Sequence, residues 1–378
     1  MDALILSCST GGGHNAAGRA IMEELESRGH HVKMLDPYAL TGGNLERIVG
    51  NGYIKVAQNT PRLFGAAYKL GEEYRRLPIH SPVYTLNKLM RKRMQAYLQE
   101  HHFDVVFMPH VFPGEILTGM KNRGIALPET IFISTDYACI PFTEETDCDY
   151  YIVPAKELKQ DYIRRGIPEE KLIPAGIPVR RAFRETMTRE EAAAELGLDK
   201  DKRYILLSGG SIGAGMIGET INVLSRYLRT HPDHRLIAIC GSNGKLMERL
   251  RAVYGGDSQI MLITSTDRMA QYMKLCDAFL SKPGGLSSTE AAVSGTPLIH
   301  ISPIPGCETI NMSFFERCGM CIAVGRNIEQ IPEVIERLQS ESFTARMVEN
   351  QRAHINPNAA AEICDLAERT VKSAAHRA

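Results

Sequence analysis

Short apolar runs alternate with stretches of helical periodicity along most of the chain. Runs of strand length occur at Ala3–Cys8, His31–Leu35, Val105–Met108, Thr130–Ser134 and Tyr151–Val153. Residues Asn15–Ser27 and Lys156–Arg165 have the apolar spacing of helices, and each stretch is followed by a glycine that can end a helix, Gly29 and Gly166. Strands that alternate with helices are typical of βαβ units, so the pattern predicts a mostly parallel sheet.

The pattern stops and then starts again near the middle of the chain. Residues Arg184–Arg203 are charged and contain few β-branched residues. Strand-like runs resume at Tyr204–Leu207, Arg235–Cys240, Ile260–Ile263, Ala278–Leu280 and Leu298–Ile301, and the Ala- and Glu-rich stretch Asn358–His376 has a helical pattern. We therefore predict an α/β fold with two domains, residues 1–183 and 204–352, joined by a linker at 184–203. A terminal helix in residues 353–378 is expected to pack back on the first domain.

Composition excludes several classes of protein. The chain has 378 residues, of which 44% are hydrophobic and 23% charged, as in soluble globular proteins. Its 44 basic and 44 acidic residues balance, so no overall charge favours nucleic acid as a partner. The nine cysteines are irregularly spaced, which favours reduced thiols in the cytoplasm. We recognise no secretory leader and no apolar run near the roughly 18 residues of a spanning helix, so any membrane contact is expected to be peripheral.

One segment departs from the neutral average. Between Leu45 and Arg93 there are ten basic and three acidic residues, and apolar residues recur at helical spacing. Basic amphipathic helices can lie on anionic membranes. The candidate membrane contacts are Arg75, Arg76, Arg91, Lys92 and Arg93. The alternative is a set of ordinary helices, each with one solvated face and one face in the core.

A glycine-rich turn joins the first predicted strand to the first predicted helix. Gly11, Gly12 and Gly13 permit positive φ and close approach of a substrate. His14 follows at the helix start, where the helix dipole disfavours the imidazolium form, and a neutral imidazole can act as a general base. Asp136 follows the strand Thr130–Ser134 and is expected at the same sheet edge. The alternative roles are a packed histidine and a helix-capping aspartate.

A second glycine turn follows the strand Ala278–Leu280. Gly284 and Gly285 precede a helix whose N-terminus suits a diphosphate, with Ser287 and Ser288 as hydroxyl donors and Glu290 placed to accept both hydroxyls of a ribose. After the next strand, Glu308 and Asn311 are of the type that binds sugar hydroxyls. Gly209, Gly210 and Ser211 lie in the opening turn of the same domain and are expected to close over the diphosphate.

The sequence gives little support for a metal site. Asp147-Cys148-Asp149 has the D-x-D pattern, but no further ligands accompany it. Cys318 and Cys321 form a single C-x-x-C, which is half of a four-ligand zinc site. No metal and no cofactor are therefore expected.

Taken together, five motifs resemble the diacylglycerol glycosyltransferase family, which contains monogalactosyldiacylglycerol synthase and the processive diacylglycerol β-glucosyltransferases. The motifs are Gly11-Gly12-Gly13-His14, Ser134-Thr135-Asp136-Tyr137, Ala175-Gly176-Ile177-Pro178-Val179, Lys282-Pro283-Gly284-Gly285 through Glu290-Ala291, and Pro305-Gly306 through Asn311. The resemblance implies the GT-B fold, in which two Rossmann-like domains face each other across a cleft. It also implies an acceptor- and membrane-binding N-terminal domain, a UDP-sugar-binding C-terminal domain, and inversion without a metal. In that scheme His14 matches the base candidate, Asp136 the essential aspartate and Glu290 the ribose contact.

Two positions depart from the family pattern. Cys307 stands where the family usually has a glutamine that contacts the donor sugar. Ala138-Cys139-Ile140-Pro141-Phe142 replaces a stretch that often contains His and Trp, and the chain has no tryptophan. The donor sugar (glucose, galactose or N-acetylglucosamine) and the acceptor therefore stay open.

The sequence predicts an enzyme that moves a hexose from a UDP-sugar, which is a substrate and not a cofactor, to diacylglycerol. The expected partners are the UDP-sugar, the membrane lipid acceptor and an anionic membrane surface, and the expected location is the cytoplasmic face of the membrane. Two kinds of alternative remain at this point. One is another enzyme on the same fold, which uses a polyprenyl-linked or soluble acceptor or epimerises a UDP-sugar, and the other is a protein that binds UDP-sugars without catalysis.

Overall fold

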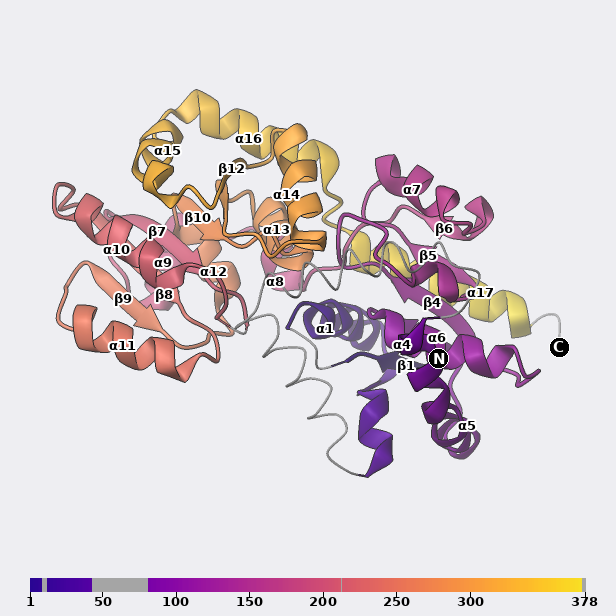
Figure 1. Ribbon diagram of the computed structural model, residues 1–378. Helices are drawn as coiled ribbons and strands as arrows, with labels where there is room; N and C mark the ends of the chain where they lie inside the picture. The colour runs from indigo at the N-terminus through magenta and orange to yellow at the C-terminus, as the bar shows by residue number, and fades with distance from the viewer. Residues whose placement is uncertain (9–11, 43–80, 212, 376–378) are drawn as a thin grey trace. The chain divides into compact units, whose positions relative to one another are not determined.

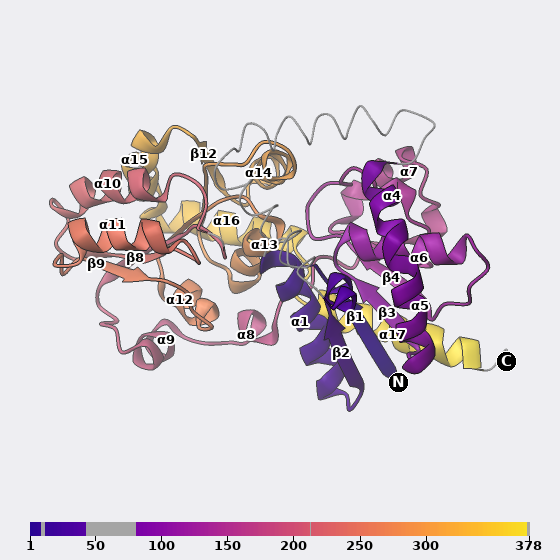
Figure 2. The same ribbon diagram turned by 60° about the horizontal axis from the view of Figure 1, so that its bottom comes forward.

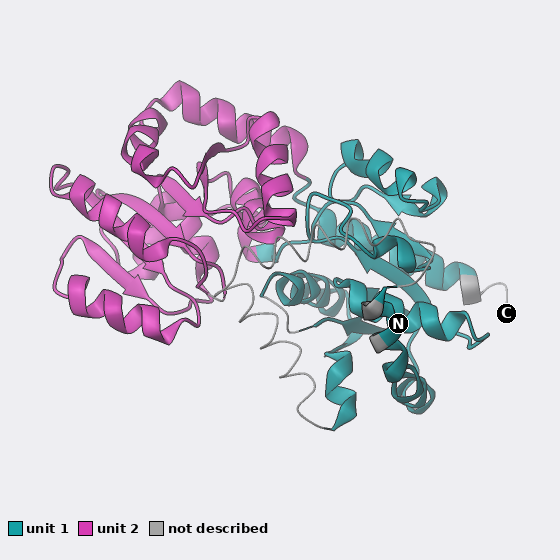
Figure 3. Ribbon diagram, viewed as in Figure 1, with its two compact units in different colours: residues 1–56, 62–181, 356–378 teal, residues 57–61, 182–355 magenta. Residues whose placement is uncertain are grey.

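The computed structural model describes residues 1–8, 12–42, 81–211 and 213–375. These residues form two compact units (Figure 3). Unit 1 comprises the described residues up to Arg181 together with those from Asn356 onward, and unit 2 comprises the described residues Ala182–Ile355. The stretch predicted as a linker contains helix α9 (Arg189–Leu196), which packs against α12 (Met269–Leu275) of unit 2. In the structure this stretch is therefore part of unit 2.

Unit 1 is built on a six-stranded sheet in the order β2-β1-β3-β4-β5-β6, and every neighbouring pair is parallel (Figures 1 and 2). Its strands are β1 (Asp2–Leu6), β2 (His31–Leu35), β3 (Val105–Met108), β4 (Glu129–Ile133), β5 (Tyr150–Ile152) and β6 (Leu172–Ile173). Its longer helices are α1 (Gly12–Ser27), α5 (Arg91–Glu100), α6 (Val111–Lys121) and α17 (Ala359–Ala375). The shorter ones are η1 (Pro37–Thr41), α4 (Pro82–Asn87), η2 (Lys88–Met90), η3 (Thr143–Glu145), η4 (Lys156–Leu158), α7 (Lys159–Arg164) and η5 (Glu169–Lys171).

Alternate residues of the central strands serve the two faces of this sheet. Ala3 and Ile5 of β1 and Val105 and Phe107 of β3 pack under α1 and α17, in one buried cluster. The residues between them, such as Leu4 and Val106, are also fully buried. Burial of both faces explains why the strands are continuously apolar, as parallel strands usually are. The terminal helix α17 packs directly against α1 of unit 1.

Unit 2 repeats this plan with a parallel sheet in the order β12-β11-β10-β7-β8-β9. Its strands are β7 (Arg203–Ser208), β8 (His234–Ile239), β9 (Ile260–Ile263), β10 (Ala278–Ser281), β11 (Leu298–Ile301) and β12 (Ile322–Gly325). Besides α9 and α12, its helices are α10 (Ile217–Leu228), α11 (Gly244–Tyr254), α13 (Gly285–Ser294), α14 (Cys307–Arg317), η6 (Ile328–Gln330), α15 (Ile331–Leu338) and α16 (Glu341–His354). The short helix α8 (Arg181–Arg184) lies at the boundary of the two units.

The order of strands reverses once in each sheet. In unit 1 the chain runs from β1 outward to β2 and then returns to place β3 on the other side of β1. In unit 2 it runs from β7 outward to β8 and β9, and β10 then pairs with the free side of β7. Ligands of open α/β sheets bind at the carboxyl ends of the strands at such a switch point. We therefore expect ligands to bind at the turns after β1 and β3 in unit 1 and after β7 and β10 in unit 2.

Candidate active site

His14 lies in the first turn of α1, at the switch point of unit 1. Its Nδ1 atom is 2.7 Å from the carbonyl oxygen of Pro109, in the turn after β3. The Oγ1 atom of Thr135, in the turn after β4, is 2.9 Å from the same nitrogen. Gly12 and Gly13, predicted as a loop, are the first two residues of α1, and Gly11 lies outside the described residues. The turns after three parallel strands therefore meet at one imidazole.

These contacts determine which ring nitrogen of His14 holds the proton in the neutral form. The Pro109 carbonyl oxygen can only accept a hydrogen bond, so Nδ1 carries the hydrogen and donates it. Nε2 is then unprotonated and presents a lone pair. A neutral ring in this tautomer can remove a proton from a hydroxyl group.

Burial and charge act in opposite directions on His14. Burial is the largest influence and lowers its pKa, whereas the Asp136 carboxylate and the Pro109 hydrogen bond raise it, and the net result is a pKa below the ordinary 6.5. His110 packs edge-on against this ring, with the two centroids 4.5 Å apart, and burial lowers its pKa as well. His110 Nδ1 accepts from Phe112 N at 3.2 Å and caps α6, so it has a local structural role. Of the two rings, His14 is the candidate base.

The turn after β4 completes this part of the site. Thr135 is buried, Asp136 is partly exposed, and both line a small cavity with His14, Pro109 and Ile140. Tyr162 of α7 fixes the turn from below, because its hydroxyl donates to Ser134 Oγ at 2.7 Å. The predicted pair His14 and Asp136 is therefore brought together, and the structure adds Thr135, which sequence reasoning missed as a contact although it stands beside Asp136.

The glycine turn after β7 lies at the switch point of unit 2. Gly210, Gly213 and Gly215 all have positive φ. Gly213 is also packed against the turn after β8, since a Cβ atom there would lie 2.0 Å from the carbonyl oxygen of Cys240. Gly209 is buried beneath this turn and Ser211 is exposed on it. The glycines thus allow a tight turn whose backbone faces the neighbouring turn after β10.

The turn after β10 leads into α13, with Gly284 as the N-cap residue and Gly285 as the first helical residue. Ser287 is partly exposed, whereas Glu290 is buried one turn into the helix. Ser288 differs from expectation, because it is fully buried and its hydroxyl is 2.9 Å from His300 Nε2. Burial lowers the pKa of His300 to about 3, so that ring is neutral. Ser288 therefore belongs to the interior packing of unit 2.

Glu308 and Asn311, predicted to bind sugar hydroxyls, contact protein groups. Glu308 Oε1 is 3.1 Å from Lys282 Nζ, and its Oε2 accepts from Ile304 N at 2.7 Å. Asn311 is fully buried and its Nδ2 donates to the carbonyl oxygen of Pro283 at 3.0 Å. Both residues lie on α14 and connect this helix to the turn after β10, and Glu308 also holds the turn after β11. The sequence predicted no role for Lys282, although this residue begins the Lys-Pro-Gly-Gly motif.

Part of the basic segment can be placed in unit 1. Arg91 Nη1 donates to the carbonyl oxygen of Gly119 at 3.0 Å, so this side chain ties α5 to α6. Lys92 and Arg93 are more open, and the nearby Leu89 is 68% exposed. Arg75 and Arg76 lie outside the described residues. The exposed basic group described by the structure is thus Lys92 and Arg93, beside an exposed leucine.

The D-x-D carboxylates have structural partners. Asp147 forms ion pairs with Lys121 and Lys171, and Asp149 accepts from the backbone N and the hydroxyl of Thr130. Among the described residues, no group of three or more His, Cys, Asp or Glu side chains is arranged to hold a metal ion. Within the same part of the chain, none of the helices has the length and apolar character needed to cross a membrane.

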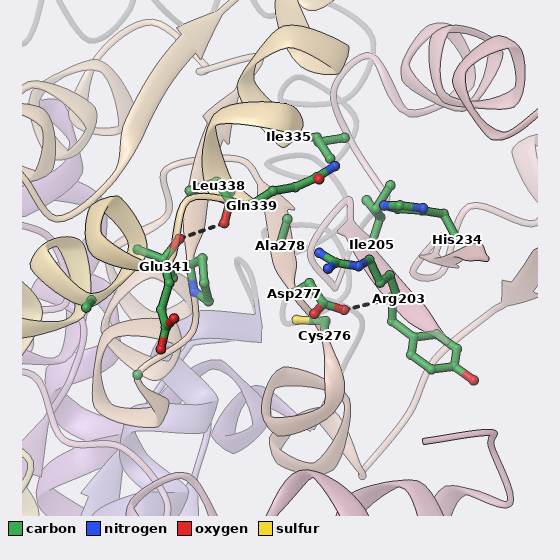
Figure 4. A pocket seen from close by; sticks show the side chains of 15 residues that line it. Arg203, Ile205, His234, Cys276, Asp277, Ala278, Ile335, Leu338, Gln339 and Glu341 are labelled. Atoms are coloured by element: carbon green, nitrogen blue, oxygen red, sulfur yellow. Dashed lines mark hydrogen bonds between the residues drawn. The ribbon is translucent and has the colours of Figure 1, made fainter. Parts of the chain in front are cut away.

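A cavity of about 470 Å³ lies at the opposite, amino-terminal edge of the unit 2 sheet (Figure 4). Its walls include Ile205, Ala278, Ile335 and Leu338, and its polar rim includes Arg203, His234 and Gln339. Asp277, which also lines it, is paired with Arg189 at 3.1 Å and accepts from Tyr204 N at 2.7 Å. This carboxylate thus connects α9 to the sheet, away from the switch point.

Comparison with known proteins agrees with this geometry. Residues 14–179 match the family described as monogalactosyldiacylglycerol (MGDG) synthase, and residues 188–359 match glycosyl transferases group 1. The MurG structure from Acinetobacter baumannii superposes with a TM-score of 0.61 and 15% identity, covering 97% of this chain and 99% of that one. A UDP-GlcNAc 2-epimerase from Neisseria meningitidis gives 0.65 and 13% identity, covering 98% of this chain and all of that one (100%). Fold and family matches together define a glycosyltransferase with the GT-B fold.

Within this class, the chain is similar over nearly its whole length to processive diacylglycerol β-glucosyltransferases. The protein of that name from Bacillus pumilus is 23% identical, and the match covers 97% of this chain and 94% of that protein. The Bacillus subtilis protein is 25% identical over 92% of this chain and 89% of its own length. The resemblance drawn from the five sequence motifs is thereby confirmed, as is the predicted fold class.

Proposed function

We propose that this protein transfers a hexose from a UDP-sugar to diacylglycerol, with inversion at the anomeric carbon, at the cytoplasmic face of the membrane. The observation that carries the proposal is the His14 imidazole, which is neutral and directs its proton to Pro109, so that Nε2 is left as the acceptor. A base of this kind suits an acceptor hydroxyl, which must lose its proton as it attacks. Diacylglycerol as the acceptor follows from the names of the Bacillus relatives.

Unit 2 is proposed to bind the donor. The N-terminus of α13 and the glycine turn after β7 both face the switch point, where backbone N–H groups favour a diphosphate. Glu290 is proposed to accept the ribose hydroxyls, and Ser287 to donate to the donor. A solved structure of similar fold holds UDP-GlcNAc, which supports a UDP-sugar as the class of donor.

The proposed reaction is a single displacement without a metal or cofactor. His14 Nε2 takes the proton of the acceptor hydroxyl, and that oxygen forms a bond to the anomeric carbon. The bond from the anomeric carbon to the diphosphate oxygen breaks, and UDP leaves with the electron pair. The Asp136 carboxylate, which already raises the pKa of His14, stabilises the imidazolium that forms. Attack opposite the leaving group inverts the configuration.

Contact with the membrane is proposed to involve unit 1. Lys92 and Arg93 are exposed on α5, and Leu89 is 68% exposed close by in the sequence. Basic side chains beside an exposed apolar one suit an anionic lipid surface, where charge attracts and the apolar group inserts. Such contact would bring unit 1 to its lipid acceptor.

The test is transfer from radiolabelled UDP-glucose and UDP-galactose to vesicles that contain diacylglycerol, with analysis of the lipid product and its anomeric configuration. We expect a β-linked glycolipid that depends on diacylglycerol. Transfer only to a polyprenyl-linked acceptor would favour the alternative lipid. UDP binding without transfer to either lipid would favour a non-catalytic binding protein, and a retained configuration would exclude the single displacement.

A further inference from the structure

Three turns of unit 2 enclose the side chain of Lys282. A Cβ atom on Gly215, in the turn after β7, would lie 3.3 Å from Lys282 Cδ and 3.4 Å from Ser302 Cβ, in the turn after β11. A Cβ atom on Gly210 would lie 4.0 Å from Lys282 Cε. The lysine therefore extends from the end of β10 past the glycine turn after β7. Its path runs along the switch point, where a ligand of this fold is expected.

Among the described residues, the ammonium of Lys282 is held by one carboxylate. Glu308 pairs with it at 3.1 Å, and the side chains of Lys282 and Glu308 are only 13% and 12% exposed. Glu308 is itself fixed by the backbone N of Ile304. An ammonium has three N–H donors, so one bond to Glu308 leaves capacity for further acceptors. The pair keeps a largely buried cation extended at the switch point.

Ser302 gives a second and independent signal at the same place. Its φ is +48°, which is uncommon for a residue with a side chain. Its Oγ atom is buried and has no hydrogen-bond partner among the described residues. Backbone strain and an unsatisfied hydroxyl each disfavour the folded chain, and such features gather at ligand sites. A buried hydroxyl that has no partner among the described residues therefore lies on the side of Gly215 next to the Lys282 side chain.

We propose that Lys282 and Ser302 bind the diphosphate of the donor, and that Glu308 is a positioning residue that holds Lys282 in place. The proposal rests on the proposed function, because it assumes a nucleoside diphosphate donor. It changes the role of Glu308, which the sequence predicts as a direct contact of the sugar. Two phosphate oxygens receive the remaining ammonium N–H groups and the Ser302 hydroxyl, while the Glu308 bond persists.

The first experiment measures UDP, UMP and uridine binding to the full chain by calorimetry. Lys282→Gln is expected to lower the affinity for UDP at least tenfold and to leave the affinity for uridine within twofold of the natural value. Lys282→Arg should restore most of the affinity for UDP, because it keeps the charge. Lys245→Gln, an exposed lysine on α11, is the control and should bind UDP like the natural chain. Equal UDP affinity of Lys282→Gln and the natural chain would overturn the proposal.

Ser302→Gly gives a readout that a merely structural role would not give. Glycine accepts the positive φ and removes the unsatisfied hydroxyl, so the variant should unfold at a higher temperature and yet bind UDP severalfold more weakly. A gain in stability with unchanged UDP affinity would remove Ser302 from the site. This variant also keeps the proposal testable if Lys282→Gln does not fold.

Glu308→Gln distinguishes the two roles of Glu308. If Glu308 positions Lys282, the variant should lose affinity for UDP and for the UDP-sugar by the same factor, and its KM should rise more than its kcat falls. If Glu308 instead contacts the sugar directly, the variant should lose affinity for the UDP-sugar and keep its affinity for UDP. That result would contradict our assignment. If the natural chain binds no UDP at all, the proposed function itself fails. If it binds UDP and transfers sugar while the Lys282 variants match it, only this inference fails.

Discussion

The Nδ1 atom of His14 lies 2.7 Å from the carbonyl oxygen of Pro109. The two residues are far apart in the sequence. His14 lies at the start of the helix that follows β1, and Pro109 lies in the turn after β3, the strand that pairs with β1 at the switch point of unit 1. One hydrogen bond thus fixes both the orientation of the ring and its tautomer. Substitution of His14 therefore tests the arrangement most directly.

His14→Gln should lower the rate of sugar transfer by about 10²- to 10⁴-fold, the usual contribution of a general base. The glutamine amide can still donate to Pro109, but it cannot take up a proton. UDP affinity should stay unchanged, because the proposed donor residues lie in unit 2. The measurements are initial rates with saturating donor and calorimetry with UDP.

The control for this variant is His31→Gln, an exposed histidine on the edge strand β2. It should retain the natural transfer rate. Transfer by His14→Gln at more than about a tenth of the natural rate is incompatible with a base at this position.

The pH dependence of transfer should report His14 and its neighbour Asp136. Burial holds the pKa of His14 below 6.5, so the base is already neutral at pH 7 and transfer falls only as the pH drops through that lowered pKa. The Asp136 carboxylate raises this pKa, and Asp136→Asn removes the negative charge. The pKa of His14 then falls further, and the acidic limb of the profile moves to lower pH.

The measurement for this second prediction is log kcat/KM from pH 4.5 to 8.5 for the natural chain and Asp136→Asn. A lower maximal rate is also expected, since the imidazolium loses its stabilising charge. An acidic limb that moves to higher pH would mean that Asp136 does not act on His14 through its charge.

Sequence patterns could predict the parallel sheet of unit 1. They could also predict that His14 lies close to the turn that follows Ser134. Parallel strands place their carboxyl ends at one edge, so turns that follow strands come together whatever their details. The predicted strand Val105–Met108 coincides with β3 for this reason, since burial on both faces leaves a continuous apolar run.

Side-chain pairing within the turns could not be predicted in the same way. Which of Ser287 and Ser288 faces the interior depends on the phase of α13, and that phase is set by where the helix begins at Gly285. The pairing of Glu308 with Lys282, 26 residues earlier, depends on the conformation of two separate turns. Local propensity does not encode such a contact, and only the folded turns create it.

Gly213→Ala should destabilise unit 2 much more than Gly210→Ala. Both glycines have positive φ, which costs an alanine about 1–2 kcal/mol. At position 213 the new Cβ atom would also lie 2.0 Å from the Cys240 carbonyl oxygen, whereas the nearest atom at position 210 is 4.0 Å away. Backbone cannot move aside as a flexible side chain can, so the additional loss should exceed about 2 kcal/mol. Urea unfolding of both variants measures the difference, and equal midpoints would contradict the described packing of the two turns.

Replacing the exposed basic pair of α5 should weaken binding to anionic vesicles. Lys92→Gln combined with Arg93→Gln should lower partitioning at least about tenfold at moderate salt, since each basic residue near the surface contributes to attraction. Leu89→Ser should weaken binding to neutral and anionic vesicles alike, because it removes apolar contact. Sedimentation with vesicles of each composition measures both effects.

The matched control is Lys245→Gln combined with Arg249→Gln, a basic pair on α11 of unit 2. Equal losses for the two pairs would mean that overall charge, and not the α5 surface, attracts the protein to the membrane.

The position of α17 has a consequence for how the protein folds during translation. The core of unit 1 includes Ile363, Cys364 and Ala367, which follow all of unit 2 in the chain. Domains usually fold as they emerge, the N-terminal one first. Here unit 2 can fold while unit 1 still lacks the helix that packs against Ile21 and Leu25 of α1. Unit 1 can therefore complete its core only after translation of α17, and until then the part of this sheet face that α1 does not cover stays exposed.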